Sequence, residues 1–291
     1  MNHKPLASAF SKIERAKTHI QDLNARIEAF FGDNPYEISS HVDSKRCEEI
    51  WEVRLTKPIP PAIFNIIEDA VHNIRAPLDK MLSAYAVRNG KSPRGVWFPI
   101  ADTLQQLKKP DSQPRRGIKK LPQQVYPFIL KSKPYKRGNP LLWWLHQIDI
   151  GDKHWDEIVS VRSHPTFRLK RLAVYYGVPL IVGSKRGHHL VQEKLPGCLE
   201  LLQQAGKPMA MFDIGPTGHL EFGISEKTVK TGYEFLTTTP GAKFKIEFHP
   251  SFEITLRQIP GFEREPVVST LNQMRDLVER LLITFEKRFF S

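Results

Sequence analysis

The feature that most constrains the fold is the helical spacing of apolar residues in three long segments far apart in the chain. Apolar side chains recur at three- and four-residue steps in residues 6–31, 61–88 and 266–290, and this spacing gathers them on one face of a helix. An Asn–Pro pair favours the start of another helix, residues 139–160, interrupted at Gly151. Because each apolar face needs a partner, we expect these helices to pack as one bundle.

The sequence pattern changes between the last two predicted helices. The pieces there are short, β-rich and separated by Gly or Pro turns such as "GPTG" and "TPGA". We therefore predict an α+β fold, a helical bundle of N-terminal, central and C-terminal helices with an inserted antiparallel β unit. The expected division assigns residues 1–165 and 262–291 to the bundle and residues 166–261 to the β-rich unit.

Two regions between the long helices have their own patterns. Residues 36–57 predict a β-hairpin, with "VDSKR" near its turn. Residues 91–140 are rich in Pro and basic residues, and we expect them to be mostly irregular, with short helices near 101–108 and 119–131.

The strongest global signal is positive charge. The 291 residues include 43 Lys and Arg against 31 Asp and Glu, a net charge of +12. Residues 108–137 alone hold ten basic residues and one acid, Asp111, which is +9 of that total. Such a local excess is typical of a surface that binds a polyanion, nucleic acid first. Together with Lys153, the predicted nucleic-acid-binding residues are Lys108, Lys109, Arg115, Arg116, Lys119, Lys120, Lys131, Lys133, Lys136 and Arg137.

Two other interpretations of this segment stay open. A basic loop can simply be solvated and keep a protein soluble. Aromatic residues interleaved with the charges can stack on unpaired bases, although packing in the core or in turns is their commoner role. These aromatic residues are Trp97, Tyr126, Phe128 and Tyr135.

Several classes of protein lack support in the sequence. No apolar run approaches the roughly 18–20 residues that span a bilayer, and the first residues lack the apolar core of a signal peptide. Cys47 and Cys198 match no metal spacing. We therefore expect a cytoplasmic protein with no membrane partner, no cofactor and no metal. P-loop, GxGxxG, GxSxG and HExxH motifs are absent.

A polar stripe runs beside the apolar face of the helix predicted over residues 61–88. Its members are spaced by four, three and four residues and are Glu68, His72, Arg75 and Asp79. Such a stripe at the edge of a cleft can hold a phosphate and move a proton. Pro77 is expected to kink the helix and to free a backbone carbonyl near Arg75. The alternative is a solvent-facing row of ion pairs.

The stretch "NIRAPLDKML" in that helix resembles the helix of HEPN-type ribonucleases, whose signature is Arg, four to six residues, then His. The resemblance implies an α-helical bundle in which Arg and His lie on one helix, meet across a dimer and cleave RNA without a metal. Arg75 matches the Arg, whereas Lys80 stands within the window and no His does. A Lys there can still stabilise charge on a phosphate. A homodimer is a further expectation of this resemblance.

A second polar cluster lies in "LHQIDIGDKHW". If its helix packs against residues 61–88, His154 can supply the imidazole that position 80 lacks. Arg75 and Lys80 would then bind phosphate, and His154 or His72 would act as the base, beside Asp79.

The residues of the second cluster also have other interpretations. His146 fits a hydrogen-bonded core histidine, and Lys153 and His154 fit structural ion pairs. A metal site, formed by His146 and Asp149 with either Asp152 or His154, matches no standard spacing.

A further resemblance to a group of bacterial proteins, carried by "RAPLD", "FPI" and "LLWWLHQIDIGDKH", bears on the fold.

Two hypotheses about function follow. The first hypothesis is a nucleic-acid-acting protein of a bacterial stress or phage-defence system, either a HEPN-like endoribonuclease or an RNA-binding protein. The alternative is a non-catalytic scaffold that binds a ligand or protein, in which the polar stripe holds the bundle together.

Overall fold

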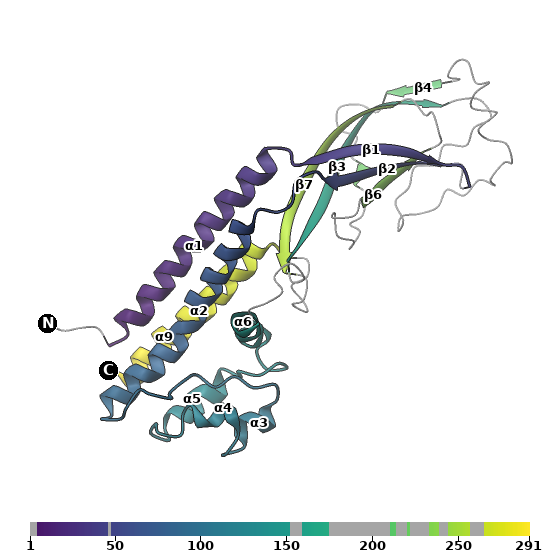
Figure 1. Cartoon of the computed structure of the whole chain (residues 1–291). Helices are drawn as coiled ribbons and strands as arrows, with labels where there is room; N and C mark the ends of the chain where they lie inside the picture. The colour runs from purple at the N-terminus through teal and green to yellow at the C-terminus, as the bar shows by residue number, and fades with distance from the viewer. Residues whose placement is uncertain are drawn as a thin grey trace. The chain divides into compact units, whose positions relative to one another are not determined.

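The fold is α+β, as predicted, and Figure 1 shows it as a computed structural model. The structure describes residues 5–45, 48–151, 159–174, 210–213, 220–221, 233–238, 244–256 and 265–291. The chain divides into two compact units. The first, the helical unit, comprises Met1–Ala29, Ile59–Val159 and Leu256–Ser291, and the second, the β unit, comprises Phe30–Pro58 and Ser160–Thr255.

The long helices form where apolar spacing predicts them. They are α1 (Ala7–Gly32), α2 (Pro61–Arg88), α6 (Pro140–Ile150) and α9 (Val267–Phe289). Helix α2 contacts both α9 and α6. Among the described residues, no helix is both long and apolar enough to cross a membrane.

The core of the helical unit consists of the predicted apolar faces. The fully buried side chains include Ile13 and Leu23 of α1, Ile67 and Leu78 of α2, and Phe285 of α9. Buried residues recur at three- and four-residue steps, as at Ile13, Ala16, Ile20 and Leu23 of α1, so each helix has one face in the core and another in solvent. Burial of such side chains stabilises the unit by roughly 1.5–3 kcal/mol each.

Local signals set the ends of the helices. Pro61 occupies the first turn of α2, where its missing N–H costs nothing. The side-chain oxygen of Asn139 accepts a hydrogen bond from the backbone N–H of Leu142 at 3.3 Å, which caps α6. Pro77 is buried inside α2, and the helix continues through it.

The predicted continuation of helix 139–160 is wrong at its end. Helix α6 stops at Ile150, and residues 159 and 160 already belong to a strand, β3 (Val159–Val174). Gly151 is the residue that ends the helix, and the strand follows where β-branched residues alternate with polar ones. Residues 152–158 lie outside the described part of the chain.

Short helices occupy the basic region between α2 and α6. They are α3 (Leu104–Lys108), α4 (Gln113–Arg116) and α5 (Val125–Lys131). Thr103 and Gln106 form a reciprocal capping box at the start of α3. The predicted short helices near 101–108 and 119–131 are thus present as α3 and α5, and α4 was not predicted.

Aromatic packing holds α5 against the long helices. The ring of Phe128 lies 5.1 Å from that of Phe285, centroid to centroid, and Tyr85 of α2 lies 5.6 Å from Phe285. Both contacts are edge-to-face, the arrangement that aromatic quadrupoles favour. The region that carries the basic residues is therefore attached to the core by α5.

The described residues of the β unit form two sheets. The predicted hairpin is present as β1 (Tyr36–Asp43) and β2 (Glu48–Leu55), paired from Tyr36 opposite Leu55 to Asp43 opposite Glu48. Strand β2 also pairs with β6 (Tyr233–Thr238). In the second sheet, β3 pairs with β4 (Ala210–Asp213), β5 (Leu220–Glu221) and β7 (Phe244–Leu256).

The hairpin is where the structure departs from the expected division of the chain. We expected residues 36–57 to belong with the helical bundle, but they form one sheet with β6 and lie in the β unit. The physical reason is that a strand edge has unpaired N–H and C=O groups, which a third strand satisfies. That partner lies about 180 residues further on, so local sequence does not reveal it.

Candidate functional site: a polar clamp and a basic surface

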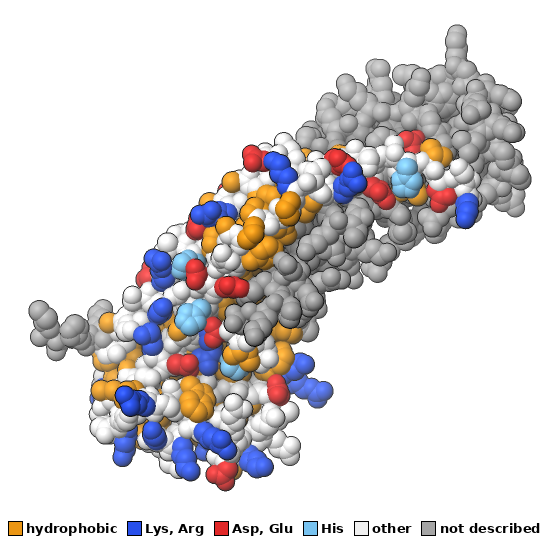
Figure 2. All heavy atoms as spheres, in the orientation of Figure 1, with side chains coloured by type: hydrophobic (Ala, Val, Ile, Leu, Met, Phe, Trp, Pro, Cys, Tyr) orange, Lys and Arg blue, Asp and Glu red, His pale blue; other side chains and the backbone are white. Residues whose placement is uncertain are grey.

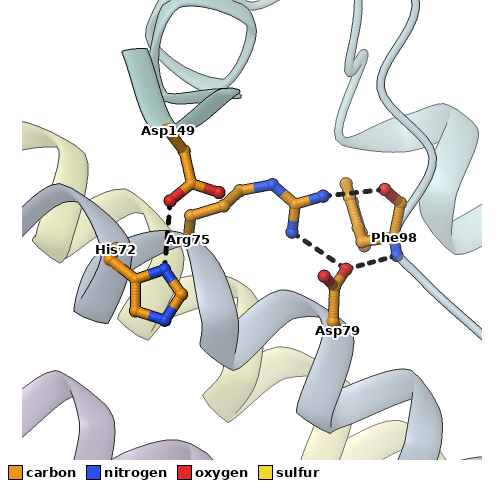
Figure 3. Close-up of polar contacts among 5 residues, drawn as sticks. All are labelled: His72, Arg75, Asp79, Phe98 and Asp149. Atoms are coloured by element: carbon orange, nitrogen blue, oxygen red, sulfur yellow. Dashed lines mark hydrogen bonds and ion pairs between the residues drawn. The ribbon is translucent and has the colours of Figure 1, made fainter. Parts of the chain in front are cut away.

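The centre of the polar stripe is Arg75 on α2, and it is buried. Its residue surface is 5% exposed. One terminal guanidinium nitrogen donates to the carboxylate of Asp79 at 2.9 Å, and the other donates to the backbone carbonyl of Phe98 at 3.2 Å. The same Asp79 oxygen accepts a hydrogen bond from the backbone N–H of Phe98 at 2.7 Å. Figure 3 shows these three residues as a closed hydrogen-bonded group, which we call the Arg75 clamp.

The clamp docks an irregular segment onto α2. Phe98 lies between α2 and α3, outside any helix or strand, and its side chain is fully buried. A segment without strand partners leaves its backbone N–H and C=O groups to be satisfied in another way. Arg75 and Asp79 satisfy both groups of Phe98, so the clamp replaces a strand partner with two side chains of a helix.

His72 forms a separate contact. Its Nδ1 lies 3.2 Å from a carboxylate oxygen of Asp149 on α6, and 64% of its side-chain surface is exposed (Figure 3). The contact joins α2 to α6, which supports a role in holding the bundle together. An exposed pair of this kind contributes at most about 1 kcal/mol to stability.

His146 of α6 is the histidine whose charge is coupled to Arg75. Burial lowers the pKa of His146 below its ordinary value of 6.5, and the positive charge of Arg75 lowers this pKa further. The carboxylates of Asp149, Asp79 and Asp102 act in the opposite direction. His146 is therefore biased toward its neutral form.

The sequence pattern predicts His154 or His72, rather than His146, as the imidazole near Arg75. The available signal was weak, because His146 lies among the buried residues Leu142, Leu145 and Ile148 and fits a core histidine equally well. Its Nδ1 and the Nε of Arg75 are both buried and lack a hydrogen-bond partner among the described residues.

Lys80, another residue of the predicted catalytic set, does not lie with Arg75. Lys80 donates a hydrogen bond to the Ser8 hydroxyl of α1 at 3.0 Å. Five residues correspond to about 140° around a helix, so Lys80 and Arg75 lie on different faces of α2. Lys153 and His154 lie outside the described residues.

The predicted basic surface lies on and around α3, α4 and α5. Nine of its ten basic residues in positions 108–137 are exposed, and Arg115 is half-buried. Figure 2 shows Lys and Arg side chains gathered over the end of the helical unit where Figure 1 places these short helices. We call these ten residues the basic surface.

Few of these cations are engaged within the protein. The Arg115 guanidinium lies 3.6 Å above the centre of the Tyr126 ring, the Lys136 ammonium lies 4.8 Å from the centre of the Trp143 ring, and Lys120 donates to the backbone carbonyl of Arg94 at 2.9 Å. Across the part of the chain that the structure describes, no member of the basic surface forms an ion pair with a carboxylate. The other seven cations of the basic surface are all exposed, so their charges face solvent.

Within the described ranges, no group of three or more His, Cys, Asp and Glu residues is placed to hold a metal ion. Comparison of the chain with protein-family models, with curated proteins and with solved structures found no match.

Proposed function

We propose that this protein binds nucleic acid, with RNA as the ligand to test first, through the basic surface. The observation that carries the proposal is the exposure of nine of the ten basic residues in a segment with one acid. Each cation that contacts a phosphate releases condensed counterions from the nucleic acid, which favours binding at low salt.

The way the basic surface is built also supports binding over a merely solvated loop. Helix α3 begins with a capping box, and α5 is anchored by the contact between Phe128 and Phe285. Cations on a packed backbone lose less conformational entropy on binding than cations on a loose chain. Their spacing is therefore set before a ligand arrives.

The proposal concerns binding without cleavage at Arg75. For Arg75 to hold a phosphate, its guanidinium must be free to donate to the ligand. Both of its terminal nitrogens are used on Asp79 and Phe98, and the residue is 5% exposed. This favours the structural interpretation of the polar stripe.

The test measures binding of a fluorescent 20-nucleotide RNA at several salt concentrations. We expect the logarithm of the association constant to fall linearly with the logarithm of salt, by roughly 0.7 per phosphate contact for a single strand. At 0.1 M salt each lost contact then weakens binding by about fivefold. The variant Lys108→Gln/Lys109→Gln should therefore bind about 25-fold more weakly than the parent.

A matched control separates the basic surface from total charge. Lys12→Gln/Lys17→Gln removes the same charge from α1 and should bind within twofold of the parent. Equal weakening by the two variants, or binding that ignores salt, would contradict the proposal. The RNA should also stay intact during incubation, and cleavage that Arg75→Ala abolishes would instead support the ribonuclease hypothesis.

A further inference from the structure

We infer that the basic surface recognises the phosphate backbone and not the bases, so that it accepts single- and double-stranded nucleic acid without sequence preference. This inference rests on the proposed function and specifies its ligand class. It follows from what the aromatic residues around the basic surface contact. Stacking of an unpaired base requires an open face of an aromatic ring.

Phe128 is part of the core. It is 5% exposed, and its ring lies edge-to-face with Phe285 at 5.1 Å and with Phe289 at 5.9 Å, centroid to centroid. The contacts that anchor α5 therefore use this ring, and a base cannot reach it.

Tyr126 is covered by one of the cations. The Arg115 guanidinium lies 3.6 Å from the ring centre, and the hydroxyl donates to the backbone carbonyl of Leu107 at 3.3 Å. A cation–π contact of this kind is worth about 0.5–1 kcal/mol at an exposed site. A base that stacked on that face would first have to displace Arg115.

The other two rings lie against glycines. A Cβ placed on Gly117 would come within 2.6 Å of three atoms of the Trp97 indole, and one on Gly138 would come within 2.5 Å of the Tyr135 ring. One face of each ring thus packs directly on backbone where no side chain intervenes, and both residues are half-buried. All four aromatic residues that the sequence offered for stacking are engaged within the protein.

In contrast to the aromatic rings, the cations of the basic surface are almost all exposed. Nine are exposed, and none forms an ion pair with a carboxylate in the described part of the chain. Lys and Arg that reach a nucleic acid without accompanying base contacts mostly bind phosphate oxygens, which carry no sequence information. Duplexes present phosphates at higher density than single strands, so their binding should depend more steeply on salt, by roughly 0.9 against 0.7 per contact.

The experiment compares three ligands with the full chain: a 20-nucleotide oligo(U), a 20-nucleotide RNA of mixed sequence, and a 20-base-pair RNA duplex. We expect the two single strands to bind within threefold of each other and the duplex to bind at least as tightly. The variants Trp97→Leu and Tyr135→Leu, checked by thermal unfolding, should bind within twofold of the parent. Tryptophan fluorescence of the parent should not be quenched by oligo(U).

The outcomes separate this inference from the proposed function. Strong quenching by oligo(U), with duplex binding more than tenfold weaker and Lys108→Gln/Lys109→Gln still impaired, would overturn backbone recognition but leave nucleic-acid binding in place. If none of the three ligands binds at 50 mM salt, the proposed function fails and this inference fails with it.

Discussion

Replacing Arg75 by Ala should destabilise the helical unit without affecting nucleic-acid binding. The change removes two hydrogen bonds made by a charged guanidinium, to Asp79 and to the carbonyl of Phe98. Each such bond contributes about 1.5–3 kcal/mol. Because 40% of the Asp79 side chain is exposed and water can solvate its charge, we take the lower end, about 3 kcal/mol in total.

Urea unfolding followed by circular dichroism at 222 nm measures this loss. With a denaturant slope of about 3 kcal/mol/M, a loss of that size lowers the unfolding midpoint by about 1 M. Arg75→Lys keeps the charge but loses the planar fork, so we expect it to recover about half of the stability. Arg137→Ala, at an exposed position, serves as the matched control and should change stability by less than about 0.5 kcal/mol.

One result would refute this reasoning. If Arg75→Ala unfolds at the same urea concentration as the parent but no longer binds or cleaves RNA, then the guanidinium serves a ligand and the clamp is incidental. Asp79→Asn gives an independent check, because the amide oxygen can still accept from the N–H of Phe98 while the ion pair with Arg75 is lost. We expect it to be less destabilising than Arg75→Ala.

Three further predictions address other parts of the helical unit. The pKa of His146 is lowered in the folded state, so the unfolded chain binds a proton at this histidine more readily than the folded chain does. The stability that neutral His146 contributes should therefore be complete above about pH 6.5. It should fall as the pH drops toward the folded-state pKa. His146→Gln should flatten that dependence in urea unfolding measured from pH 7.5 to 5. Phe128→Ala should lower the free energy of unfolding by about 3–5 kcal/mol, and it should also abolish RNA binding because α5 detaches. A Phe128→Ala variant with the unfolding midpoint of the parent would contradict the anchoring role. Asn139→Ala should lower the free energy of unfolding by about 1 kcal/mol through loss of the α6 cap, whereas Asn139→Asp should retain most of the cap's contribution. Thermal unfolding of the two variants measures both effects.

The long helices were predictable from the sequence because their signals are local. Apolar residues at three- and four-residue steps define one face, and Pro61 lies at the start of its helix. The predicted ranges 6–31 and 61–88 correspond closely to α1 and α2. The hairpin was also predicted, since strand residues and a turn lie next to each other in the chain. Its second partner, β6, was not, because strand pairing over such a separation depends on the whole sheet.

The same distinction applies to the two candidate sites. Exposure of the basic surface was predictable, because unpaired cations are too costly to bury and the segment contains one acid to pair with them. Helical spacing also placed Arg75 and Asp79 one turn apart. Only the tertiary structure decided that this pair faces the backbone of Phe98 instead of a cleft, because that depends on where a segment 23 residues further along packs. Likewise, the packing of α6 against α2 brought His146 under the influence of Arg75. Neighbouring residues in the sequence determine side-chain chemistry and helical period, whereas contacts between distant segments determine the partner of a buried charge.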